Sequence, residues 1–227
     1  MLFLFDIDGT LLRGMPPLHR LALCDAAWQI FQVQILPSGL GETAGMTDTL
    51  IIQRALQWAG LSPAAIESGL PRCFQAASAA YEERLILSDL RPYHTPEAQK
   101  TLEWLKKSGV YLGLVTGNIQ RIAWAKLGAA GLSDYFAAGG FGDEAAEREK
   151  LPPLAIARVE EFSGHRFHTD EVVVVGDTPD DVRCGAACGL TTIAVATGPK
   201  YSREELQASG ADYVFDDLGG LATLQLN

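Results

Sequence analysis

Basic residues are scarce in this chain of 227 residues, which has 18 Lys and Arg against 28 Asp and Glu and a formal net charge of −10. Nucleic acids and anionic membranes bind basic surfaces, so this shortage argues against both as partners. The excess acids are either scattered over the surface for solubility or partly gathered into a site that needs a cation.

Cysteines and long apolar runs are also few. The four cysteines form no CxxC pair and have no zinc-type histidine spacing, so we expect reduced, buried thiols. The apolar start of the chain is broken by Asp6 and Asp8 and follows no basic segment, which argues against a signal peptide. No run reaches the roughly 18 uncharged apolar residues of a membrane-spanning helix. We therefore expect a cytoplasmic protein.

Short apolar runs that stop at polar residues predict the strands of a buried parallel sheet. These runs occupy residues 2–5, 111–115, 172–175, 192–196 and 213–215. Helical segments lie between them at 96–107, 119–127, 152–162 and 181–187. Strands that alternate with helices indicate the α/β class, here a Rossmann-like parallel sheet with helices on both faces.

One long stretch, residues 15–88, contains no convincing strand. It is expected to form helices at 18–33, 47–58, 63–70 and 73–85. We therefore predict two domains. The α/β core comprises residues 1–14 and 89–227, and a small all-helical cap comprises residues 15–88.

The ends of the predicted strands carry a consistent set of polar groups. In open α/β sheets, ligands bind beyond the carboxyl ends of the strands. The first strand ends at 6–10 (DIDGT), the second at 116–118 (TGN) and the third long run at 177–181 (DTPDD). Clustered carboxylates need a compensating charge, and Mg²⁺ commonly binds one or two carboxylates together with phosphate oxygens. This edge therefore predicts a Mg²⁺ site that faces a phosphorylated ligand.

Two carboxylates two residues apart, Asp6 and Asp8, can divide the work of phosphoryl transfer. One can attack phosphorus and form an aspartyl phosphate. The other can protonate the leaving oxygen and then activate a water. Thr116 and a Lys or Arg can donate to the phosphoryl oxygens that are not transferred. The candidate substrate contacts at the same edge are Gly9, Thr10, Gly117 and Asn118.

The motifs of this chain resemble those of the haloacid dehalogenase (HAD) superfamily of phosphohydrolases. The sequence matches its DxDGT signature at 6–10, its Ser/Thr motif at Thr116 and its GDxxxD motif at 176–181, in the family's order. The helical insert resembles the family's C1-type cap. The resemblance implies Asp6 as nucleophile and Asp8 as acid/base. It further implies a metal site formed by Asp6, Asp177 and the backbone carbonyl of Asp8, supported by Asp181.

The family's remaining motif is a Lys or Arg just before a helix, and two residues compete for this role. Lys150 stands three residues before Pro153, as in the family's common KPxP pattern, and is preferred. Arg148 resembles an Arg-x-x-Leu variant and stays the alternative. In the cap, residues 45–48 resemble the loop that reaches substrate in relatives, which makes Thr47 a candidate contact. The alternative is that Thr47 simply caps a helix.

The resemblance implies a Mg²⁺-dependent phosphatase that acts on a small metabolite such as phosphoglycolate or a sugar phosphate. Dehalogenation is disfavoured because Asp8 is present. Phosphonoacetaldehyde hydrolysis is disfavoured because no lysine precedes Lys100. A phosphomutase of the β-phosphoglucomutase type is the alternative, since it shares every core motif. A non-catalytic scaffold that binds phosphorylated ligands or a protein is the third reading. The sequence leaves open whether the protein is a monomer or a small homo-oligomer.

Overall fold

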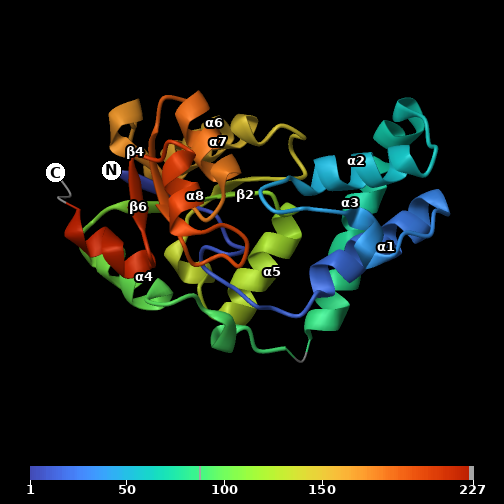
Figure 1. The fold of residues 1–227 in the computed structure, drawn as a ribbon, viewed down its shortest axis with the longest axis horizontal. Coiled ribbons are helices and arrows are strands. Elements are labelled where there is room, and N and C mark those ends of the chain that lie inside the picture. Colours follow the sequence, from blue (N-terminus) through green and yellow to red (C-terminus); the bar gives the residue numbers. More distant parts are fainter. Residues whose placement is uncertain (87, 225–227) are drawn as a thin grey trace.

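The computed structural model describes residues 1–86 and 88–224, which form a sheet with helices and a group of helices to one side of it (Figure 1). The sheet has six strands. They are β1 Leu2–Phe5, β2 Tyr111–Thr116, β3 Gly139–Phe141, β4 Val172–Gly176, β5 Thr191–Val195 and β6 Tyr213–Phe215.

All neighbouring strands are parallel, in the order β3-β2-β1-β4-β5-β6. Strand β1 lies in the middle, and its Leu4 is in register with Gly113 of β2 and Val174 of β4. After β1, the chain forms β2 and β3 on one side of it and later forms β4, β5 and β6 on the other side. Ligands of open α/β sheets bind at such a switch point, beyond the carboxyl ends of the strands.

Helices cover both faces of the sheet, as the alternation of strands and helices predicts. The core helices are α4 Ala98–Lys107, α5 Gln120–Ala130, α6 Leu151–Ser163, α7 Pro179–Ala187 and α8 Arg203–Ala208. Successive side chains of a strand point to opposite faces. In β1, Leu2 and Leu4 pack in one cluster with α6 and α7, and Phe3 and Phe5 pack in another with α4 and α5.

Short 3-10 helices complete the chain. They are η1 Pro37–Leu40, η2 Arg91–Tyr93, η3 Ser133–Tyr135, η4 Arg148–Lys150, η5 Thr169–Glu171 and η6 Leu218–Thr223. None of the helices in the described part of the chain combines the length and apolarity that a membrane crossing requires.

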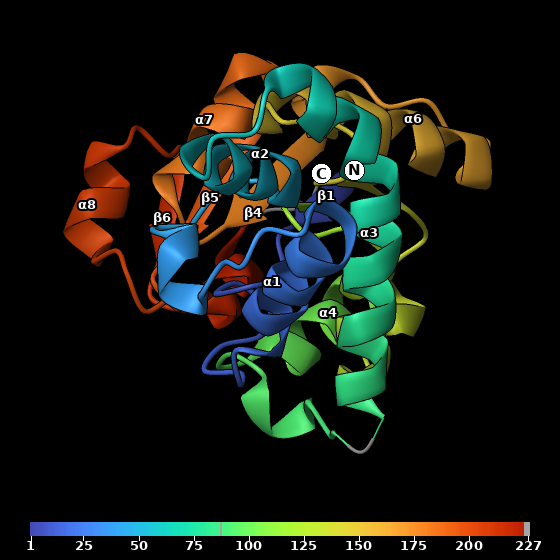
Figure 2. The ribbon, with the colours of Figure 1, turned by 90° about the vertical axis from the view of Figure 1, so that its right-hand side faces the viewer.

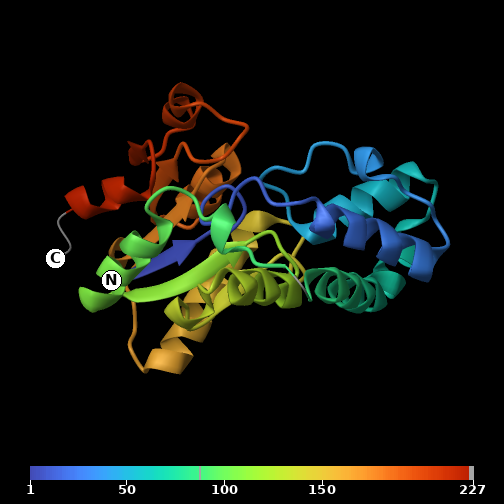
Figure 3. The same ribbon diagram turned by 90° about the horizontal axis from the view of Figure 1, so that it is seen from below.

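The cap consists of α1 Leu18–Phe31, α2 Asp48–Trp58 and α3 Pro63–Leu85, with α1 lying against α3 (Figures 2 and 3). The expectation of separate helices at 63–70 and 73–85 was wrong, because α3 runs through Pro71 without a break. An interior proline costs about 3 kcal/mol. Buried side chains on both sides of it, such as Ile66 and Ala77, offset that cost. The exact core–cap boundaries, after 14 and before 89, stay a prediction.

Strand β3 and helix α8 were not predicted from the sequence. Two of the three residues of β3 are glycines, which have low strand propensity. A Cβ at Gly140 would collide with the backbone of Leu151, so glycine allows the start of α6 to approach the sheet edge. The local sequence therefore does not predict β3, and the strand forms because tertiary packing favours it.

Candidate active site

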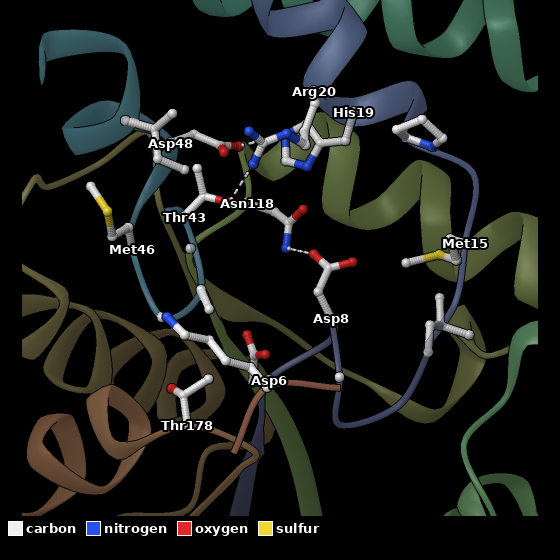
Figure 4. A pocket seen from close by; sticks show the side chains of 18 of the residues that line it. Asp6, Asp8, Met15, His19, Arg20, Thr43, Met46, Asp48, Asn118 and Thr178 are labelled. Carbon is white, nitrogen blue, oxygen red and sulfur yellow. Dashed lines mark hydrogen bonds and ion pairs between the residues drawn. The ribbon is translucent and has the colours of Figure 1, made fainter. Parts of the chain in front are cut away.

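A cavity of about 560 Å³ lies where the carboxyl ends of the central strands meet the cap (Figure 4). The core lines it with the ends of β1, β2 and β4, through Asp6, Asp8, Gly9, Gly117, Asn118, Asp177 and Thr178. The cap lines it with residues near the start of α1, with the loop 42–46 and with Asp48. The three strand ends singled out in the sequence therefore face one cavity.

Three buried carboxylates gather at the core side of this cavity. One oxygen from each of Asp6, Asp177 and Asp181 lies within 4.8 Å of the others. Burial raises the pKa of Asp6 to about 7, and burial together with the charges of Asp181 and Asp6 raises the pKa of Asp177 well above its ordinary value. Carboxylates that resist ionisation in this way would be stabilised by a cation. Their oxygen donors fit Mg²⁺, which prefers hard ligands.

The loop after β1 is shaped around Asp177. Gly9 has a φ of 93°, and a Cβ on it would collide with the Asp177 carboxylate. The hydroxyl of Thr10 donates to Asp177 Oδ1 at 3.2 Å. Thr10 is fully buried and does not line the cavity. Its contacts are those of a residue that holds the loop and the carboxylate in place.

Arg148 is the cation that the fold brings to these carboxylates. Its Nη2 lies 2.9 Å from Asp6 Oδ1 and 2.5 Å from Asp181 Oδ1. Burial opposes its charge, yet the carboxylates of Asp181 and Asp6 hold the pKa of Arg148 above its ordinary value. Among the residues described, its Nε is the buried side-chain polar atom without a hydrogen-bond partner. Because Arg148 also lines the cavity, its charge suits an anionic ligand.

Lys150, which the sequence motif favoured over Arg148, lies elsewhere. Its side chain is 62% exposed, pairs with Glu147 at 3.0 Å and does not line the cavity. Residues 148–150 form the 3-10 helix η4, in which three residues make a turn. Two residues within one such turn point in different directions, so only Arg148 reaches the carboxylates.

Asp8 lies on the other side of the cavity and is held by a lysine. Lys126 Nζ lies 2.8 and 2.6 Å from its two carboxylate oxygens, and Asn118 Nδ2 donates to Oδ2 at 2.7 Å. Burial alone would raise the pKa of Asp8, but the charge of Lys126 and these hydrogen bonds hold it below its ordinary value. The carboxylate form of Asp8 is therefore favoured.

Lys126 was missed in the sequence. It lies on the buried face of α5, between apolar residues such as Ile122 and Ala130. A lysine is almost never fully buried unless it is paired. A lone lysine on the apolar face of a predicted helix was therefore the sequence feature that could have identified Lys126 as a paired, buried site residue.

The loop after β2 connects the core site to the cap. The hydroxyl of Thr116 accepts a hydrogen bond from Asn118 Nδ2 at 2.7 Å, and Thr116 is buried and does not line the cavity. The carbonyl of Gly117 accepts the backbone N–H of Asp48 at 2.7 Å. A Cβ on Gly117 would collide with the carbonyl of Met46, so glycine permits this approach.

The cap contributes His19 and Asp48, neither of which was assigned from the sequence. His19 Nε2 lies 2.9 Å from Asp48 Oδ2, and its Nδ1 lies 3.2 Å from Lys126 Nζ. Thr47 is buried, accepts the N–H of Leu50 as the N-cap of α2, and donates to the Ala146 carbonyl at 2.8 Å. It does not line the cavity, although its neighbours do.

Comparisons with known proteins agree with this architecture. A family model for haloacid dehalogenase-like hydrolases matches residues 1–189. The phosphoglycolate phosphatase of Haemophilus influenzae is 28% identical over 223 residues, which is 97% of this chain and 96% of that protein.

Two solved structures share the fold over nearly the whole chain. CbbY of Rhodobacter sphaeroides, solved with xylulose 1,5-bisphosphate, superposes with a TM-score of 0.71 at 21% identity and covers 99% of both chains. A candidate beta-phosphoglucomutase from Thermotoga maritima gives a TM-score of 0.59 at 19% identity, with 99% of both chains covered. At these identities the likeness establishes the fold alone.

Proposed function

We propose that this chain, which belongs to the haloacid dehalogenase-like hydrolases, cleaves the phosphate ester of a small metabolite through an aspartyl phosphate on Asp6. It is a phosphatase of the phosphoglycolate phosphatase-like type, acting on phosphoric monoesters. The observation that carries the finer proposal is the group Asp6, Asp177, Asp181 and Arg148 at the core side of a cavity that also contains Asp8.

In the first step, a carboxylate oxygen of Asp6 attacks phosphorus and the bond from phosphorus to the ester oxygen breaks. Asp8 gives the departing oxygen the proton that it takes from water in the second step of the preceding turnover, and Lys126 stabilises the carboxylate that this transfer leaves. Arg148 orients Asp6 through Nη2, and because Arg148 lines the cavity its charge can offset that of the phosphoryl oxygens. These roles make Asp6 the nucleophile and Arg148, rather than Lys150, the phosphate-binding cation.

In the second step, Asp8 accepts a proton from a water that attacks the aspartyl phosphate, which releases phosphate and regenerates Asp6. Its contact with Lys126 favours the ionised form that this step needs. Mg²⁺ would be held by Asp6, Asp177 and the backbone carbonyl of Asp8, with Asp181 in support, and would neutralise charge on the phosphoryl oxygens.

The size and walls of the cavity favour a small substrate. Its volume of about 560 Å³ is within the range of about 300–1,000 Å³ for small-molecule sites, and cap residues form one wall. The names of similar proteins, a phosphoglycolate phosphatase and a protein crystallised with xylulose 1,5-bisphosphate, point to phosphorylated acids and sugars. Gly9, Gly117 and Asn118 line the cavity and are the proposed substrate contacts, together with Arg148.

The test is release of phosphate from a panel of phosphorylated metabolites, with and without Mg²⁺. We expect turnover that needs Mg²⁺ and is lost in Asp6→Asn. Activity that persists in EDTA or in Asp6→Asn would overturn the mechanism. The mutase alternative predicts glucose 6-phosphate, rather than free phosphate, from β-glucose 1-phosphate with a bisphosphate primer. A binding scaffold predicts ligand affinity without turnover of any ester in the panel.

A further inference from the structure

A closed ring of polar contacts joins Asp8 to the cap. Lys126 Nζ contacts both oxygens of Asp8 and also lies 3.2 Å from His19 Nδ1. His19 Nε2 contacts Asp48 Oδ2 at 2.9 Å. That oxygen also accepts the backbone N–H of Ile119 at 2.7 Å, and the adjacent Asn118 returns the ring to Asp8 at 2.7 Å.

The chemistry of the groups fixes the direction of each bond in the ring. An ammonium can only donate, so His19 Nδ1 accepts from Lys126. The imidazole proton then lies on Nε2 and is donated to the carboxylate of Asp48. The remaining donors of Lys126 go to Asp8 and to Asn118 Oδ1, the latter at 2.6 Å. All three N–H groups of the ammonium therefore have partners.

The ring crosses from the core to the cap and back. Asp8, Asn118 and Lys126 belong to the core, whereas His19 lies on α1 and Asp48 begins α2 (Figure 4). Lys126 and Asp48 are each only 2% exposed. Water therefore cannot readily replace a missing partner, and loss of one leaves a buried polar group unsatisfied. The edge-to-face contact of His19 with Tyr81 of α3, at 6.0 Å between ring centroids, holds the imidazole from a second side.

We propose that His19, oriented by Asp48, is a positioning residue that holds Lys126, and through it Asp8, in the geometry for proton transfer when the cap is docked. This inference rests on the role of Asp8 in the proposed function. His19 acts through Lys126 and does not itself contact Asp8. The acid/base group of the core is thus completed by a side chain of the cap.

The experiment compares three substitutions of His19 in the full chain. His19→Leu removes both hydrogen bonds. His19→Gln keeps an acceptor for Lys126 and a donor for Asp48 on a side chain of similar reach. His19→Asn carries the same groups on a shorter stem that cannot span both partners. His94→Leu is the matched control, because His94 is another partly buried histidine with a single hydrogen bond, 2.8 Å to the Ala130 carbonyl, and lies outside the cavity.

Two substrates separate a positioning role from a general structural one. The alkyl ester β-glycerophosphate needs a proton on its leaving oxygen, whereas 4-nitrophenyl phosphate releases a stable phenolate without one. We expect His19→Leu and His19→Asn to lower kcat for the alkyl ester by about 10²-fold, the lower end of general acid–base effects, with KM changed less than about threefold. With the aryl ester, aspartyl phosphate still forms fast but hydrolyses slowly, so these variants give a burst of one nitrophenolate per enzyme.

His19→Gln should restore steady turnover of both esters, and His94→Leu should behave as the unaltered protein. Equal loss for both esters without a burst, or a Gln variant no better than Leu and Asn, would overturn the inference. If His19→Leu does not fold, as judged by its melting temperature, the contrast between Asn and Gln decides the matter. An unaltered protein that fails to turn over either ester with Mg²⁺ contradicts the proposed function instead, and so does an active Asp6→Asn variant.

Discussion

The core and the cap reach the same cavity by different means. The core brings its reactive groups there on short loops that directly follow parallel strands, so the pairing of β1, β2 and β4 determines where they lie. The cap is docked by the packing of α3 against α5, by the contact of His19 with Lys126, and by polar contacts of residues 47–49 with the core loops. Among these, the hydroxyl of Thr49 donates to the Gly142 carbonyl at 2.6 Å. The positions of the carboxylates therefore depend on the sheet, whereas the enclosure of the cavity and the contact of His19 with Lys126 depend on how the cap docks.

The largest effect should come from breaking the core side at Arg148. Arg148→Met leaves Asp6 and Asp181 without their shared cation. Removing one partner of a buried ion pair costs about 3–5 kcal/mol, and loss of a phosphate donor should lower kcat by at least about 10²-fold. Urea unfolding and phosphate release measure the two effects. Lys150→Met is the control, since this exposed side chain should change stability by less than about 0.5 kcal/mol. The reverse ranking of the two variants would contradict the assignment of the cation.

Mg²⁺ should stabilise the core in a pH-dependent way. Because folding raises the Asp6 pKa from 3.8 to about 7, the folded chain binds that proton more tightly than the unfolded chain. Between these values the metal-free protein loses stability from this group as the pH rises. Mg²⁺ binds the ionised form, so its effect grows with pH. At 100 times its Kd, the metal adds about 2.7 kcal/mol. A melting temperature raised by Mg²⁺ at pH 8, and less so at pH 5.5, is expected. A shift that is larger at pH 5.5 would count against the site.

A smaller effect should come from a substitution that weakens the contact between cap and core and leaves the carboxylates in place. Gly117→Ala places a methyl group against the Met46 carbonyl, at an expected cost of about 1–3 kcal/mol, together with a higher KM. Stabilisation by Mg²⁺ should be retained, because the metal ligands lie in the core. Gly128→Ala is the matched control: nothing lies within 4 Å of its added Cβ, and alanine favours a helix such as α5. Loss of the Mg²⁺ effect in Gly117→Ala would show that core and cap are not separable in this way.

The smallest effect is expected at Thr47. Thr47→Ala removes the N-cap of α2 and the bond to the Ala146 carbonyl, for about 1 kcal/mol of stability. Because Thr47 does not line the cavity, KM should stay within about twofold. A large rise in KM in a stable variant would restore the idea that Thr47 contacts substrate.

The core and the cap also differ in how much of each could be predicted from the sequence. Apart from β3 and α8, the sheet and its covering helices were predictable, and so was the group Asp6, Asp8 and Asp177, because each of these residues closely follows an apolar strand and parallel strands end at one edge. In the cap, helical periodicity was visible, but the continuity of α3 through Pro71 was not. That continuity depends on packing against α1, which local sequence does not contain.

By itself, the sequence determined the fold class, the order of the motifs and the residues at the strand ends, because strand pairing turns local patterns into one shared edge. The tertiary structure decided the matters that depend on direction and on distant partners. It places Arg148, and not Lys150, against the carboxylates, since the turn of η4 points only one of these two side chains toward them. It also brought Lys126 and His19, 107 residues apart in the chain, into contact beside Asp8. Such contacts arise only when the cap docks on the core, because no local preference encodes which buried groups will meet.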